Sequence, residues 1–370
     1  MVTNTVVFRE QGRYCSHPCI AKLANGDWLV AFSAAPQGDK LRHPPDYPDF
    51  VNLLVRSSDQ GRSWSKPYRV PNGDWHGVEV PAIAQISTGE VFLNQWRFRW
   101  SSTDAAKARQ ASSADQSFYF NEQDRRWRRV TAVSDWAAHP YPYARADDGA
   151  YVHVSDDGGQ TWSSTVPIDI NPYQGAFGLR GVIELTNGDL VMPMGSHDHD
   201  PLAAIFLVRS RDRGRSWDRP TEVARAAGLI FSEPSALVTA SGALLLFSRE
   251  ETSGFIHQSV SEDGGLTWAQ PRRLDLWGYP TQGIELADGR ILIVYGHRRQ
   301  PFGIKAAMSK DGGKTWVEEI QVRADLADTY TGHNLGYPSV IEFEPGRLFV
   351  VYYGEDEGGT TCIHGTYLEV

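Results

Sequence analysis

Six segments of the chain share one pattern of hydrophobic and polar positions. In each segment, two runs rich in Val, Ile, Leu and aromatic residues flank a short polar turn that contains glycine. This pattern predicts a β-hairpin, because glycine takes the backbone angles of a tight turn and the flanking runs can pair as strands. The predicted hairpins are Cys19–Ser33, Val80–Trp96, Gly181–Met194, Pro234–Ser248, Gln282–Gly296 and Pro338–Tyr353.

A second repeat lies between the hairpins. The pattern Ser-x-Asp-x-Gly-x-(Ser/Thr)-Trp occurs five times. Its Asp and Ser/Thr oxygens can bond nearby backbone N–H groups, its glycine permits a tight turn, and its Trp provides an apolar anchor. We therefore interpret the octapeptide as structural. Its copies are Ser57–Trp64, Ser155–Trp162, Ser210–Trp217, Ser261–Trp268 and Ser309–Trp316.

The two repeats together predict the fold. One hairpin and one octapeptide turn supply the four strands of a blade, so six such units predict an all-β, six-bladed β-propeller. The sixth unit has no octapeptide, and we expect its strand Thr361–Tyr367 to pair with the N-terminal run Thr5–Arg9. A single domain is predicted over residues 1–370, with an insertion at about 98–147 in blade two that contains a predicted helix, Asp104–Gln116.

Composition narrows the function classes. The formal charge of −9 argues against a nucleic-acid-binding protein, and no apolar run reaches the roughly 18 residues of a membrane span. The three cysteines cannot all pair with one another, and the N-terminus shows no secretory signal, so reduced thiols and a cytoplasmic location are expected. No cofactor is expected. The ligand-rich run His197–Asp200 is interpreted as a solvated loop rather than a metal site.

Candidate chemistry gathers at one edge of the predicted blades. In an antiparallel hairpin the first strand begins where the second one ends, so these positions lie opposite the turns. They combine arginines with Tyr, His and carboxylates, a mixture that can bind and transform an anionic sugar. The first strands begin at Tyr14–His17, Glu79, Phe177–Arg180, Glu233, Tyr279–Gln282 and Tyr337, and the second strands end at Asp39–Asp49, Arg97, His197–Asp200, Arg249–Glu251, His297–Arg299 and Tyr353–Glu357.

On these residues the sequence resembles the sialidase (neuraminidase) family, from about Tyr14 to Glu355. The octapeptides are known in that family as Asp-boxes. Further matches are Ser232-Glu233-Pro-Ser, Leu246-Phe-Ser-Arg249 and Gly336-Tyr337-Pro-Ser-Val. The resemblance implies an exo-glycosidase that acts on a terminal acidic sugar with retention of configuration.

The resemblance also implies catalytic roles. Tyr337 is the implied nucleophile, Glu233 its base, and Asp46 the acid/base, with Asp39 and Asp49 as rivals for that role. A tyrosine suits a substrate whose anomeric carbon carries a carboxylate. A neutral phenol delivers oxygen without the repulsion that an ionised Asp or Glu would meet.

Two arginines, Arg249 and Arg298, are implied to hold the acid group of the substrate. The sequence departs from the family at the first arginine of its carboxylate-binding triad, because the matching positions read Ser16-His17-Pro18, and Ala34-Ala35-Pro36 also lacks an expected arginine. His does not reproduce a bidentate guanidinium clamp. The other predicted substrate-binding residues are His17, His43, Arg180 and His297.

Two other function classes stay open at this point. A lyase that acts on a uronate-type sugar would use His or Tyr as base and acid, and its candidate residues are His17, His43, His297 and His333. A propeller that binds carbohydrate without catalysis is the third class. All three predict a carbohydrate as the ligand.

Overall fold

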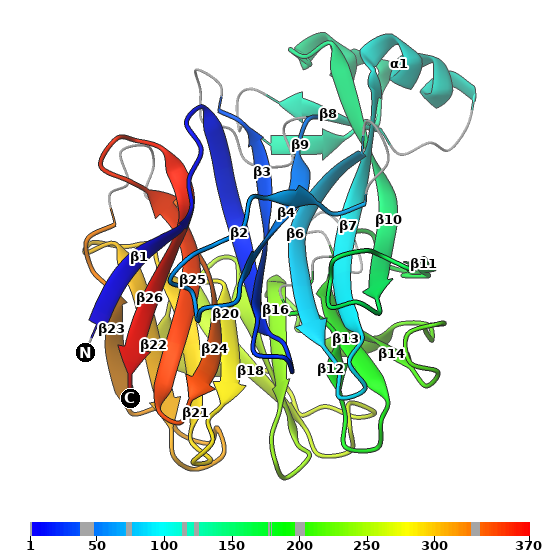
Figure 1. The fold of residues 1–370 in the computed structure, drawn as a ribbon. Coiled ribbons are helices and arrows are strands. Elements are labelled where there is room, and N and C mark those ends of the chain that lie inside the picture. Colours follow the sequence, from blue (N-terminus) through cyan, green and yellow to red (C-terminus); the bar gives the residue numbers. More distant parts are fainter. Residues whose placement is uncertain are drawn as a thin grey trace.

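The structure, a computed structural model, describes residues 2–37, 48–71, 76–112, 117–121, 126–176, 178, 180–196, 204–326 and 334–370, without the side chains of 76–79, 110–112, 126, 318 and 319. Within these ranges the strands form six antiparallel sheets (Figure 1), and the fold is the predicted six-bladed β-propeller. Each sheet is one blade. In blades one to five the first strand along the chain is the innermost one and lines the central channel, and in blade six the strand Gly336–Glu344 takes this place.

The strands follow one another regularly through blades one to five. Blade one contains β2 (Arg13–Lys22), β3 (Trp28–Pro36), β4 (Val51–Ser57) and β5 (Tyr68–Arg69). Blade two contains β6 (His76–Gln85), β7 (Val91–Ser102), β10 (Tyr143–Ser155) and β11 (Ser164–Ile168). Blade three contains β12 (Ile183–Glu184), β13 (Leu190–Gly195), β14 (Ile205–Ser210) and β15 (Thr221–Ala224). Blade four contains β16 (Phe231–Val238), β17 (Leu244–Glu250), β18 (Phe255–Ser261) and β19 (Arg272–Trp277). Blade five contains β20 (Thr281–Glu285), β21 (Ile291–His297), β22 (Gly303–Ser309) and β23 (Glu318–Arg323).

Blade six is built from both ends of the chain. Its strands β24 (Gly336–Glu344), β25 (Arg347–Glu355) and β26 (Thr361–Glu369) are completed by β1 (Val2–Phe8). β1 pairs antiparallel with β26, and the two termini lie near each other (Figure 1). This pairing confirms the predicted closure of the ring.

Blade two carries additional elements between β7 and β10. They are α1 (Thr103–Ser112), β8 (Ser117–Asn121), β9 (Arg126–Arg129) and the 3₁₀ helix η2 (Val133–Ala138). β8 pairs with β10, and β9 extends the same sheet. β7 ends and β10 begins at the edge opposite the hairpin turns, so these elements rise from that edge (Figure 1).

The five octapeptides fold into the same turn. In each copy the first Ser accepts the N–H of the motif glycine at 2.7–2.9 Å and donates its hydroxyl to the motif Asp at 2.8 Å. The Ser or Thr before the Trp donates to the other oxygen of the same Asp at 2.5–2.6 Å. The octapeptide therefore makes the hydrogen bonds of its turn with its own side chains. This explains why the same residue types recur at the same positions in all five copies.

The hydrophobic core is divided into clusters between neighbouring blades. Trp64 packs into the cluster between blades six and one. In the same way, the tryptophans of the next four octapeptides each pack between their own blade and the preceding one. A sixth cluster lies between blades five and six, where no octapeptide occurs. The motif Trp is therefore an anchor between blades.

A second set of contacts joins the blades at their hairpin turns. The residue four positions before a turn glycine reaches back to the turn of the preceding blade. Gln85 and Glu184 accept the N–H groups of Ala24 and Ser87 at 2.7 and 2.6 Å. The same contact recurs from Ala240 to Glu285 and from Ala287 to Glu342, and Lys22 donates to the carbonyl of Phe343.

Two further expectations concern the cysteines and the membrane. Cys15, Cys19 and Cys362 are all buried, and the structure joins none of them in a disulfide. In the described part of the chain, no helix has the length and apolar character that crossing a bilayer requires.

Gly214 provides a test of blade packing. A Cβ at this position would lie 2.4 Å from the Phe92 ring, and φ is +80°. At Gly188, φ is +84° but nothing lies within 4 Å of the added carbon. We expect Gly214→Ala to lower the free energy of unfolding by about 1–3 kcal/mol more than Gly188→Ala, because only the former combines overpacking with backbone strain. Thermal unfolding of both variants checks this, and equal losses would contradict it.

The octapeptide carboxylates predict acid sensitivity. Hydrogen bonds from the motif Ser or Thr side chain lower the pKa of Asp59, Asp157, Asp212 and Asp311 from 3.8 to about 2. A pKa below its unfolded value contributes stability above pH 3.8 that is lost as the pH falls towards 2. We expect Tm to fall steeply over this window. Asp157→Asn should make the fall shallower, whereas Asn at the fully exposed Asp275 should leave it unchanged.

Candidate functional site

One backbone feature positions the candidate site. His17, Val80, Glu233 and Tyr337 each precede a proline in an innermost strand and have φ of 53°, 44°, 51° and 47°. Each lies at a register shift between the first two strands of its blade. Non-glycine residues rarely adopt positive φ, and such strain persists only where the surrounding structure enforces it. The bulge brings the side chains of His17, Glu233 and Tyr337 together from blades one, four and six.

The centre of the site is a contact between Tyr337 and Glu233. The Tyr337 hydroxyl donates a short hydrogen bond to Oε1 of Glu233. The other carboxylate oxygen, Oε2, is 3.3 Å from Nη1 of Arg249. Glu233 is buried and Tyr337 is half-buried. This arrangement places a phenol beside an anionic acceptor for its proton.

Arg249 is held from three sides. Besides Glu233, its guanidinium contacts Glu251, with 3.1 Å between Nη2 and Oε2, and lies 3.7 Å above the ring of Tyr279. Glu251 is itself fixed by a hydrogen bond from the Ser232 hydroxyl. Burial disfavours the charge of Arg249, but Glu233 and Glu251 outweigh it and raise its pKa above the ordinary value. Arg249 is therefore a permanent cation beside the carboxylate of Glu233.

Arg298 approaches the same centre from blade five. Its Nε donates to the carbonyl of Leu335 at 2.9 Å, and its Nη2 lies 3.5 Å from the Tyr353 hydroxyl. Its guanidinium carbon is 5.2 Å from the ring centre of Tyr279 and 5.6 Å from that of Tyr337. Burial opposes its charge, but Tyr353, Tyr337 and Glu233 raise the pKa of Arg298. Its hydrogen-bond acceptors in the described structure are neutral.

His17 flanks the tyrosine on the blade-one side. Its ring meets that of Tyr337 edge to face at 4.1 Å and lies 5.3 Å from the ring of Tyr353. Its Nδ1 is 2.7 Å from the Ser16 hydroxyl. His17 is thus part of the cluster that sequence reasoning predicted, and it supports the ring of Tyr337.

The structure places the other predicted residues elsewhere. His297 lies at the rim, where Nδ1 is 3.0 Å from the carbonyl of Pro301 and the ring packs against Trp277. Arg180 lines a cavity of about 650 Å³ in the central channel. In the described structure, neither residue contacts the Tyr337–Glu233 pair. Several predicted residues lie outside the described part of the chain, namely Asp46, His43, Asp39, His333 and His197–Asp200. Asp49 is described and exposed.

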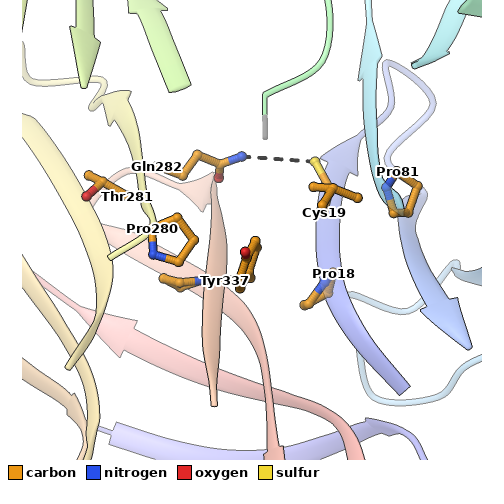
Figure 2. Close-up of a pocket in the computed structure, with 9 residues that line it drawn as sticks. Pro18, Cys19, Pro81, Pro280, Thr281, Gln282 and Tyr337 are labelled. Atoms are coloured by element: carbon orange, nitrogen blue, oxygen red, sulfur yellow. Dashed lines mark hydrogen bonds between the residues drawn. The ribbon is translucent and has the colours of Figure 1, made fainter. Parts of the chain in front are cut away.

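Three residues of the site had no predicted role. Glu251, Tyr279 and Tyr353 stand at the strand ends that the sequence assigned to this edge, yet only the fold shows that they support the two arginines. For Tyr279 a signal exists, because it precedes a proline in the same way as Tyr337. Figure 2 shows the small pocket beneath the site, in which Tyr337 faces Pro280 and Gln282 on one side and Pro18 and Cys19 on the other.

The arrangement places a phenol and a carboxylate in direct contact beside two arginines. The phenol of Tyr337 and the carboxylate of Glu233 can exchange a proton directly, while Arg249 and Arg298 can stabilise negative charge. Among the described residues, no group of three or more His, Cys, Asp or Glu side chains is placed to hold a metal ion.

Comparison with solved structures places the fold among carbohydrate-active propellers. A protein of unknown function from Dyadobacter fermentans DSM 18053 superposes with a TM-score of 0.81 at 23% identity, covering 100% of this chain and 99% of that one. A sialidase from Streptococcus pneumoniae gives 0.66 at 14%, covering 98% and 70%. An α-L-arabinanase from Penicillium chrysogenum gives 0.60 at 15%, covering 99% and 98%. At these identities the likeness establishes the fold.

The sequence itself decides the family. No curated protein matches it significantly. The profile of the BNR repeat-like domain, however, matches residues 144–350, more than half of the 370-residue chain and four of its five octapeptides. The chain belongs to the BNR repeat-like domain family and is a sialidase-like protein of the BNR superfamily.

Proposed function

We propose that this protein is an exo-glycosidase that removes a terminal acidic sugar with retention of configuration. The observation that carries the proposal is the hydrogen bond from Tyr337 to Glu233 beside two half-buried arginines, Arg249 and Arg298. Solved sialidases and an arabinanase with this fold support a glycoside as the substrate class. Neither of the other function classes is better supported.

The first step forms a glycosyl–tyrosine bond. The Tyr337 oxygen attacks the anomeric carbon as its proton passes to Glu233, and the bond from that carbon to the leaving-group oxygen breaks. The leaving-group oxygen takes a proton from an acid, for which Asp46 is our candidate from the sequence. In the second step this residue accepts a proton from water as the water oxygen attacks the same carbon. The bond to Tyr337 breaks, and Glu233 returns the proton to the phenolate.

The two arginines have different parts in this proposal. Arg249 is shared between two carboxylates, Glu233 and Glu251, so little of its charge is available to a ligand. Arg298 has only neutral hydrogen-bond acceptors in the described structure. The acid group of the substrate is therefore held mainly by Arg298, whereas Arg249 holds the carboxylate of Glu233 in place.

Tyr337→Phe tests the nucleophile. Without the hydroxyl we expect kcat to fall about 10³-fold or more, because no oxygen remains to form the covalent intermediate. The assay uses 4-methylumbelliferyl glycosides of N-acetylneuraminic and glucuronic acids, with proton NMR of the first-formed sugar anomer. The matched control is Tyr367→Phe, which removes a hydroxyl bonded to the carbonyl of Gln60 at 2.7 Å at an octapeptide turn.

Several outcomes would contradict the proposed function. They are near-wild-type activity of Tyr337→Phe, an inverted product anomer, and an unsaturated product that absorbs in the ultraviolet. Failure of the wild-type protein to cleave any acidic glycoside would also overturn it.

Arg298→Gln tests how the acid group is recognised. We expect kcat/KM for an acidic glycoside to fall about 10- to 100-fold, the cost of a lost charge-assisted hydrogen bond. Gln at the neighbouring Arg299, whose guanidinium is exposed and stacks 3.6 Å above Trp277, should change it little. Equal effects of the two substitutions would show that general surface charge, rather than Arg298, selects the substrate.

A further inference from the structure

Four blades share one irregularity in their strand pairing. In blade six the ladder advances three residues on β24, from Gly336 to Ser339, but only two residues on β25. Two residues of the innermost strand, Tyr337 and Pro338, therefore face a single residue of the neighbouring strand, which defines a β-bulge. Blades one, two and four have the same count at the same place. Their bulge residues are His17-Pro18, Val80-Pro81 and Glu233-Pro234.

Proline occupies the second position of each of these bulges, eight residues before the turn glycine of its hairpin. Blade five provides the comparison. Its residue at this position is Thr281, and β20 pairs with β21 from Thr281 to Glu285 without a register shift. Among the blades whose pairing the structure describes at this position, the bulge therefore accompanies proline and is absent with threonine.

The geometry of the proline ring explains this difference. The ring fixes φ at about −65°, whereas a regular antiparallel strand has φ of about −140°. The strand therefore departs from its regular path at the proline, and the bulge takes up the mismatch. The residue before the proline then holds a positive φ, which is 47° at Tyr337 and 51° at Glu233.

The surroundings of the prolines hold this strained conformation in place. A non-glycine residue at positive φ costs roughly 1–3 kcal/mol, which the packing around it must offset. All four prolines are buried. Pro234 fits closely against blade three, because a Cβ added to Gly195 would lie 3.2 Å from Cδ of Pro234. Proline also has no N–H group that would need a partner at a buried position.

The bulge decides where the side chain before the proline points. Successive side chains of a strand lie on opposite faces, so one extra residue changes the face on which the residues before it lie. Tyr337 and Glu233 come from blades six and four, and their hydrogen bond forms only while both side chains point toward each other. Two bulges must therefore persist together for the pair to exist.

We propose that Pro338 and Pro234 are positioning residues, which hold Tyr337 and Glu233 in the orientation that joins the phenol to the carboxylate. The inference rests on the proposed function, because it assigns both prolines to the same site. Without the proline ring the strand can take a regular φ and release its strain, and the side chain before it turns away from its partner. A displacement of about 1 Å at such a contact lowers the rate about 10²-fold.

Pro338→Ala and Pro234→Ala test this role. We expect kcat for the acidic glycoside that the wild type cleaves to fall about 10²-fold in each variant, with KM changed less than about twofold. The reacting pair moves in these variants, whereas Arg298 keeps its hydrogen bond to the carbonyl of Leu335. Steady-state kinetics that separate kcat from KM check this expectation.

The repeat itself supplies the matched control. Pro81→Ala removes the equivalent proline from the equivalent bulge, but the residue before it is Val80, which has no polar group. This variant should lose about as much Tm as Pro338→Ala and keep a kcat close to that of the wild type. A general loosening of the fold would instead lower kcat in both variants.

Crystal structures of the variants test the positioning independently of turnover. In Pro338→Ala, Tyr337 should take a negative φ and lose its hydrogen bond to Glu233. In Pro81→Ala, the same backbone change should occur at Val80 while the Tyr337–Glu233 pair stays intact. Pro234→Ala gives a second measurement on the same pair if Pro338→Ala does not fold.

The positioning role and the proposed function fail on different results. A wild-type protein that cleaves no acidic glycoside overturns the proposed function, and the crystal structures then still decide the role of the prolines. An active wild type with unchanged kcat in both Pro338→Ala and Pro234→Ala overturns the positioning role alone. An equal loss of kcat in Pro81→Ala, or a positive φ retained at Tyr337 in Pro338→Ala, overturns it as well.

Discussion

The pairing of β1 with β26 is the contact on which the rest of the structure depends. It makes blade six from both ends of the chain and seals the cluster between blades six and one. The contacts of Tyr337 with Glu233 and His17 at the centre of the site each join two blades. Tyr337 reaches Glu233 across 104 residues, and His17 meets Tyr337 from the opposite end of the sequence. An open ring would let these strands separate, so site geometry and ring closure are one constraint.

The repeat separates the sources of stability from the source of chemistry. At one edge of the blades, the octapeptide turns and side chains such as Gln85, which bonds to the hairpin turn of the preceding blade, join neighbouring blades. The bulges with positive φ lie at the opposite edge. Val80 shows that the bulge belongs to the scaffold, because it has the same backbone angle as Tyr337 with an inert side chain. The fold thus presents one strained position in four blades, and the residue placed there decides whether that blade contributes chemistry.

The sequence predicted the fold well because the repeat encodes local physics. A glycine turn or an octapeptide forms its hydrogen bonds within its own few residues. Each copy can therefore be predicted from its own sequence. Tyr337, Glu233 and Arg249 were predictable together because strand polarity assigns them to one edge.

Contacts that depend on side-chain reach could not be predicted in the same way. Spacing along the chain does not show that Glu251 shares Arg249 with Glu233, or that Arg180 enters the channel instead of joining the pair. Loop residues such as Asp46 carry no periodic signal, so their role rests on the resemblance alone.

The electrostatics of the channel axis differ from those of the whole chain. The protein has a formal charge of −9, yet Arg180, Arg249 and Arg298 all lie near the axis. Their charges are not equivalent. Arg249 is neutralised by two carboxylates, whereas Arg298 meets carbonyl and hydroxyl groups. In the described structure, the arginine beside Tyr337 that bonds to no carboxylate is therefore Arg298, and because it is half-buried its charge is screened less than that of an exposed side chain. A negative protein can then attract an anion to its axis while its surface repels the same anion elsewhere.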